Sequence, residues 1–319
     1  KRGTSCPAQK IYCAPPPTLI HPPPREGESM DQSSTALIKK LTTFETVKPS
    51  PFDDRTYTPR ALLLCSLPYR KPKTETWIRN AGRYTLKILP DADHAIPYGS
   101  YPRLFNYWLT NEVKRTKQKT LMIGGSYETF LYAIGIKDGG KQRRNFMKQA
   151  HNFLTATITF TERTSNGKIV DCMRAAISKR YRLFWDVTEP REDTLFKTEI
   201  SLTEEYYEEV MTHAIPLNLK MIDALKRSPL ALDLYGWMNY KFYAMAHQRI
   251  PHQTISWSLL NSQFGGQFAR VRDFKVNSEL CLRIIQHLWP QAKFKITSNS
   301  LTLLPSSTSV APKFLRLLP

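Results

Sequence analysis

The pattern of hydrophobic and polar positions changes near residue 60. Residues 61–67 form an apolar run suited to a buried strand, and residues 84–89 alternate as a half-buried strand does. Apolar side chains then recur with helical period over about residues 100–116. They occupy positions i, i+3, i+4 and i+7 of that stretch: Tyr101, Leu104, Phe105 and Trp108. Two strands followed by an amphipathic helix are therefore expected.

Two further helices are predicted after this one. Ser126 can cap a short helix with its hydroxyl, and Gly135 can end that helix in the left-handed conformation. A longer helix follows Gly140, and its apolar face consists of Phe146, Ala150, Phe153 and Thr157. Nearly opposite lie polar and basic residues, namely Lys141, Arg144, Lys148 and Asn152. The pattern predicts a helix with one buried face and one basic face.

The same layout occurs a second time. Ser228 and Pro229 predict the start of a helix, because a capping residue precedes a proline at the first turn. Eighteen residues separate Trp108 from Ser126 in the first copy and Met238 from Ser256 in the second, and each serine is followed nine residues later by glycine. Residues 256–264 then form a short helix, and about 269–289 a basic one. The repeat indicates two tandem copies of one structural unit.

Each basic helix precedes a predicted β-hairpin. Residues 157–161 and 169–173 flank Ser165-Asn166-Gly167, a strong hairpin signal, and residues 292–297 and 300–304 flank Ser298-Asn299. A further strand is expected at 181–185. Helix, short helix, glycine turn, basic helix and hairpin form the layout of a winged helix-turn-helix, whose second helix enters a groove of DNA. The expected fold class is α+β, with two tandem winged-helix domains.

The expected segments are a disordered tail (1–58), the first winged helix (59–190), the second (191–306) and a short C-terminal tail (307–319). Ten of the 23 prolines lie within residues 1–60, and this stretch shows no apolar period. Met30 is an alternative candidate for the natural start of translation.

The charge distribution favours a polyanionic partner. Of the net charge of +19, residues 61–180 contribute +13, from 21 basic and 8 acidic residues. Lysine and arginine gain free energy by displacing the counterions of DNA, although an anionic membrane surface would attract them too. No apolar run is long enough to span a membrane. The five cysteines are scattered, without a C-x-x-C pair, which favours a reducing cytoplasm and no metal or other cofactor.

The candidate DNA-binding residues come from the basic helices and the hairpin tip. Arg144 and Asn145 have the chemistry to read guanine and adenine edges, whereas Lys141 and Lys148 suit phosphates. The whole predicted set is Lys141, Arg143, Arg144, Asn145, Lys148, Asn152, Arg163, Lys168, Arg270, Arg272 and Lys275.

An enzymatic alternative rests on one short segment. Residues 135–141 fit the phosphate-binding spacing G-x-x-x-x-G-K, but Gln142 stands where a nucleotide hydrolase needs Ser or Thr to hold magnesium. The preceding residues have helical instead of strand period. The metal-binding histidine pair of a nicking initiator and the H-x-x-R motif of a tyrosine recombinase are both absent from the sequence. A protein without catalytic activity is expected.

Residues 60–305 resemble the plasmid-encoded RepA-type replication initiators. The resemblance rests on Leu67-Pro68-Tyr69-Arg70-Lys71-Pro72, Tyr98-Gly99-Ser100-Tyr101-Pro102-Arg103-Leu104, Trp108-Leu109-Thr110-Asn111-Glu112, Gly139-Gly140 before Arg143-Arg144, Ile255-Ser256-Trp257 and Gln263-Phe264-Gly265. It implies two winged-helix domains, binding to repeated sites in a plasmid origin, opening of the adjacent AT-rich duplex and recruitment of host initiator and helicase proteins. It also implies exchange between homodimer and monomer, with the dimer surface on the first domain. A winged-helix transcriptional repressor and a P-loop-like nucleotide hydrolase are the alternatives.

Overall fold

The computed structural model describes residues 55–123, 130–132, 134–136, 139–182 and 198–310. Most of the expected N-terminal tail, the capping residue Ser126, the strand beyond Arg182 and residues 311–319 lie outside these ranges. Within them the protein is mixed α+β, as predicted. None of the helices in these ranges is long and apolar enough to cross a membrane.

The first repeated unit contains a three-stranded antiparallel sheet. Along the chain run α3 (Ser100–Thr116), β4 (Thr120–Ile123), the helical residues 130–132, α5 (Gly140–Thr155), β7 (Ser178–Arg182) and β8 (Thr198–Leu202). The strand order is β4-β8-β7, so the last strand lies in the middle. The bounds of α3 agree with the predicted helix, and Gly135 has the expected left-handed backbone, with φ of 71°.

The second unit has the same order of elements. It comprises α8 (Pro229–Gln248), β10 (Gln253–Ser256), α9 (Trp257–Phe264), α10 (Val271–Leu288), β11 (Phe294–Ile296) and β12 (Ser300–Leu303). Its strand order, β10-β12-β11, again places the last strand in the middle. Ser228 and Ser256 cap α8 and α9 by accepting from the backbone N–H three residues later. The repeat seen in the sequence is therefore also a repeat in the order of elements and strands.

A four-stranded sheet is inserted into this plan. It contains β2 (Trp77–Ala81), β3 (Tyr84–Leu89), β5 (Thr157–Arg163) and β6 (Ile169–Ala176), all antiparallel. The predicted hairpin around Gly167 is confirmed. This hairpin was expected to be the wing of the first winged helix. It belongs to a different sheet, because β5 pairs with β3 and not with a strand of the three-stranded sheet. Local sequence encodes a hairpin, but it does not encode which distant strand joins it.

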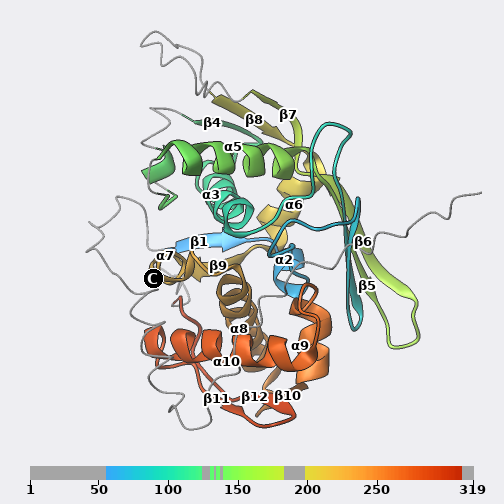
Figure 1. The fold of residues 1–319 in the computed structure, drawn as a ribbon, viewed down its shortest axis with the longest axis vertical. Coiled ribbons are helices and arrows are strands. Elements are labelled where there is room, and N and C mark those ends of the chain that lie inside the picture. The colour runs from blue at the N-terminus through green and yellow to red at the C-terminus, as the bar shows by residue number, and fades with distance from the viewer. Residues whose placement is uncertain (1–54, 124–129, 133, 137–138, 183–197, 311–319) are drawn as a thin grey trace, which may run out of the picture.

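The remaining elements connect the two units. Strand β1 (Arg55–Thr58) pairs with β9 (Ile215–Asn218), and β8, which follows the expected domain boundary at 190, pairs with β4. Helices α6 (Glu204–His213) and α7 (Leu219–Leu225) flank β9 in the chain. Figure 1 shows β1 and β9 between α3 above and α8 below, α5 with its sheet at the top, and α10 with its sheet at the bottom.

The apolar run at 61–67 is a helix instead of the predicted strand. Helix α2 (Arg60–Leu64) packs on α8, and four of its five residues are buried. A short helix that is buried all round shows no 3.6-residue period, so its sequence is indistinguishable from that of a buried strand. Gly236 of α8 permits the close approach, because a Cβ there would lie 2.5 Å from Leu63 Cδ2.

A buried ion pair joins α3 to α8. Arg103 donates from Nε to Asp233 Oδ1 and from Nη2 to Oδ2, both at 2.7 Å, and both side chains are buried. The same guanidinium also donates to the backbone carbonyls of Leu67, Pro68 and Gly99. Each of the three guanidinium nitrogens thereby has an acceptor, which is the condition under which a buried charge is tolerated.

Candidate nucleic-acid interface

Helix α5 is anchored by aromatic packing on one side. Phe146 and Phe153 are fully buried, and their ring centroids lie 5.7 and 6.3 Å from that of Phe105 in α3. Three of the four residues of the predicted apolar face are buried in the helix, namely Phe146, Ala150 and Phe153, whereas Thr157 lies beyond the helix as the first residue of β5. This packing fixes the rotation of α5 about its own axis, and so determines which side chains point outward.

The outward face of α5 is basic over its first two turns. Lys141, Arg144, Asn145 and Lys148 are all exposed, whereas Arg143 is half-buried and makes contacts within the protein. The first turn contains no acidic residue, and Gly139 at the N-cap offers no side chain to the free N–H groups there. Basic side chains and the positive end of the helix dipole therefore favour an anion at the same place.

Asn152 does not belong to this face, which corrects the prediction for that residue. It is 2% exposed, and its Oδ1 accepts from the backbone N–H of Ala95 at 3.2 Å. One turn earlier, Gln149 accepts from the N–H of Tyr98. The loop before α3 therefore crosses the second half of α5 and covers it. Helical periodicity alone could not show that a distant loop occupies part of a polar face.

Strand β7 adds positive charge beside α5, which the sequence interpretation missed. Lys179, Arg180 and Arg182 are exposed, and the Tyr181 hydroxyl lies 3.3 Å from Nδ1 of His151 on α5. Burial lowers the pKa of His151, and the nearby His94 imidazole lowers it further, so the neutral form is favoured at this junction. Three basic residues within five positions of one strand were the available signal.

The hairpin residues Arg163 and Lys168 lie elsewhere. Arg163 donates from Nη1 to Thr85 Oγ1 at 3.1 Å, within the four-stranded sheet, and Lys168 is exposed in the β5–β6 turn. In Figure 1 this hairpin follows the right-hand side of the molecule, away from α5. The structure therefore does not bring these two residues together with the basic face of α5.

Helix α10 presents a smaller basic face. Arg270 and Arg272 are both exposed, and Arg270 also pairs with Asp273 at 3.0 Å on the surface. Lys275 is half-buried and donates to the Ser298 carbonyl at 3.1 Å. Lys275 thus attaches the helix to the β11–β12 turn. Val276, one turn after Arg272, is 59% exposed. Val276 was not among the predicted site residues.

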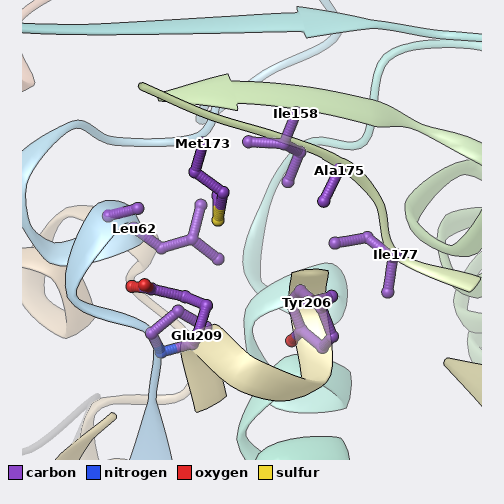
Figure 2. A pocket seen from close by; sticks show the side chains of 9 residues that line it. Leu62, Ile158, Met173, Ala175, Ile177, Tyr206 and Glu209 are labelled. Atoms are coloured by element: carbon purple, nitrogen blue, oxygen red, sulfur yellow. The ribbon is translucent and has the colours of Figure 1, made fainter. Parts of the chain in front are cut away.

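One small pocket lies between α2, β5–β6 and α6. Figure 2 shows Leu62, Ile158, Met173, Ala175 and Ile177 around it, with Tyr206 and Glu209 on α6 at its lower side. Its lining is therefore mainly aliphatic. The described residues contain no group of three or more His, Cys, Asp or Glu side chains that could hold a metal ion.

The structure shows which elements lie on either side of residues 135–141, the segment with the spacing of a phosphate-binding loop. Residues 130–132 are helical, Gly135 ends that turn, and α5 begins at Gly140. A phosphate-binding loop requires a strand before its first glycine.

The protein thus has a mixed α+β fold with two repeated units, and each unit has a basic helix on its surface. A family model described as "Plasmid encoded RepA protein" matches residues 96–259, about half of the chain. The chain belongs to this family, which confirms the RepA-type resemblance found in the sequence.

Two solved structures align with most of this chain. A crystal structure of RctB domains 2–3 aligns with a TM-score of 0.48 at 12% identity, over 76% of this chain and 96% of that one. A selenomethionine derivative of RctB domain 2 and domain 3 aligns with a TM-score of 0.47 at 11% identity, over 79% and 97%. The comparison with curated protein sequences gave no match.

Proposed function

We propose that this protein is a plasmid replication initiator that binds repeated sites in its origin through two winged-helix units. The observation that carries the proposal is the repeated order of helix, strand, basic helix and two strands, with the last strand central in both sheets. In a winged helix the third helix enters the major groove while the last two strands flank it. Helices α5 and α10 would be the recognition helices of the two units.

Helix α5 has more exposed side chains suited to DNA contacts than α10 has. The exposed part is its N-terminal half, the part of a recognition helix that reaches base edges. Arg144 can donate two hydrogen bonds to guanine, and Asn145 can bond adenine in the same bidentate way. Lys141 and Lys148 are point charges suited to phosphates, and the basic side chains of β7 extend the positive surface.

Helix α10 would make fewer contacts. Arg270 and Arg272 are its exposed basic side chains near the N-terminal end, and Val276 offers an apolar contact for a thymine methyl group. Because the ion pair of Arg270 with Asp273 is exposed to solvent, it holds Arg270 only weakly. Lys275 is half-buried and donates to the Ser298 carbonyl, so we assign it to the support of the helix.

The proposed activity requires no bond-breaking chemistry. Binding energy and protein partners would open the AT-rich duplex beside the repeats, with recruitment of host initiator and helicase proteins. A monomer would bind the repeats, in equilibrium with a homodimer formed through the first unit. The site of action would be the bacterial cytoplasm.

A transcriptional repressor with the same fold is the second candidate function. It is favoured by the same two helices, because binding at a promoter needs only the DNA interface. The two functions differ in whether the bound DNA opens, so permanganate reactivity of thymines beside the bound repeats distinguishes them.

The experiment is a binding titration with the full chain and two DNAs. One DNA is a fragment of the plasmid that carries the repeats beside this gene, and the other is a random duplex of equal length. Arg144→Ala should cost about 1–3 kcal/mol on the repeat DNA and little on random DNA. Lys148→Ala should weaken both and reduce the salt slope by about one. Phe146→Ala is the control for loss of the fold, because it removes a fully buried aromatic side chain.

Equal losses on both DNAs for Arg144→Ala, with the circular dichroism spectrum unchanged, would show that Arg144 does not read bases. Base reading would then be sought at Arg270 and Arg272. Failure of the wild-type chain to prefer the repeat DNA would contradict the proposed function.

A further inference from the structure

The four-stranded sheet has two chemically different faces. Strand register places Trp77, Ile88, Ile158 and Ala175 in one row across the sheet, and all four are buried. The adjacent row, one residue along each strand, contains Ile78, Lys87, Thr159 and Arg174, and each of these is at least partly exposed. Because side chains alternate between faces, this row defines an open outer face of the sheet.

The outer face carries positive charge alone. Lys87 and Arg174 lie in the exposed row, and Arg163 reaches the same face through its bond to Thr85. The acidic residues of the four strands, Glu162 and Asp171, face the other side, where Arg60 lies within 3.8 Å of both. Register leaves no acidic side chain pointing outward from any of these four strands.

The chemistry between the charges suits phosphate oxygens. Thr85, Thr159 and Asn80 add hydroxyl and amide groups to the outer face, and such groups commonly bond the DNA backbone. Lys87 and Arg174 stand in one row two strands apart, a separation of about 9–10 Å from the usual strand spacing. The two cations can therefore reach different phosphates.

The residues at the outward positions favour duplex DNA over single-stranded DNA as the partner. A surface for single strands combines positive charge with aromatic side chains on which bases stack. The outward positions of the four strands contain no aromatic residue; Tyr84 and Phe160, which stack at 5.7 Å, belong to the buried side.

We propose that this outer face contacts the phosphates of duplex DNA beyond the segment held by α5 and α10. The inference rests on the proposed function and extends it by a third, sequence-independent contact surface. Its place in the fold suits that role, because β5 begins just after α5 ends, and β5 and β6 continue from there along one side of the molecule (Figure 1).

The test uses the full chain and a random 40-base-pair duplex, titrated at several salt concentrations. The variant Lys87→Gln/Arg174→Gln removes two charges from the outer face, and Lys87→Arg/Arg174→Lys is the matched control that keeps both. Each lost phosphate contact removes about 0.9 from the log–log salt slope, so the neutral variant should lose about 1.8 and bind about 30-fold more weakly at 0.15 M salt. The charge-conserving control should stay within about 3-fold of the wild type.

Three results would overturn the proposal. Unchanged slope and affinity in the neutral variant, with wild-type binding intact, would remove this surface and leave the proposed function standing. A change in the sedimentation of the variant without any change in DNA binding would assign the face to contact between two copies of the chain. Failure of the wild type to bind the random duplex, while it still binds the repeat DNA, would remove this inference alone, and failure on both DNAs would remove the proposed function as well.

Discussion

The ion pair between Arg103 and Asp233 should be the strongest single link between the two repeated units. Both side chains are buried and the pair is bidentate, at 2.7 Å for each bond. Asp233→Asn leaves a buried guanidinium without its counter-charge, and we expect a loss of about 3 kcal/mol in the free energy of unfolding. Arg103→Met should cost more, about 5 kcal/mol, because it also removes donors from backbone carbonyls such as that of Leu67.

The double variant tests the coupling directly. Arg103→Met already removes the ion pair, so the second substitution, Asp233→Asn, breaks no further interaction between the two side chains. The double variant Arg103→Met/Asp233→Asn should therefore be no less stable than Arg103→Met alone. The expected coupling energy is about 3 kcal/mol. Arg103→Lys should fall between the wild type and Arg103→Met, since an ammonium keeps the charge but not the fork.

The assay is urea unfolding of the full chain, followed by circular dichroism and by tryptophan fluorescence. Coincident transitions are expected, because the pair and the β1–β9 pairing connect both units. Additive losses of about 8 kcal/mol in the double variant would show that the two side chains act independently, and the reasoning from geometry would be refuted.

Three smaller changes probe other contacts. Gly236→Ala should destabilise the chain by about 1–3 kcal/mol, as measured by urea unfolding, because its Cβ meets Leu63; Leu63→Ala should recover part of that loss, and independent effects would contradict the contact. The lowered pKa of His151 means that the unfolded chain binds its proton more readily, so stability falls as pH drops below 6.5; His151→Gln should flatten urea midpoints between pH 7 and 5, and an unchanged pH profile would count against the assignment. A chain that starts at Arg55 should melt like the full chain, whereas one that starts at Arg60 loses β1 and should melt several degrees lower; equal melting of the two would show that β1 contributes nothing.

The sequence was most informative where an element has one buried and one exposed side. The apolar stripe of α3 predicted its residues, and the alternation at 84–89 predicted β3, because periodicity directly reports which side is buried. The caps at Ser228 and Ser256 could be predicted because each serine bonds a backbone N–H only three residues later, which depends on local sequence alone.

The failures come from contacts between distant segments. Helix α2 is buried all round and shows no period, so it resembled a strand. The hairpin at Gly167 was found, but its partner strand lies about 70 residues earlier in the chain. Asn152 has the spacing of the basic face, yet a loop from another part of the chain covers it. Within the candidate site, local pattern therefore predicted the exposed half of α5 and missed the neighbouring charges of β7.

If α5 and α10 both hold DNA, hydroxyl-radical footprinting on the repeat-bearing origin fragment should detect both contacts. We expect two protected segments per repeat on one face of the duplex, about one helical turn apart. Arg144→Ala should weaken protection of one segment, and Arg272→Ala should weaken the other. A single protected segment that neither substitution changes would contradict the proposal that both helices hold DNA.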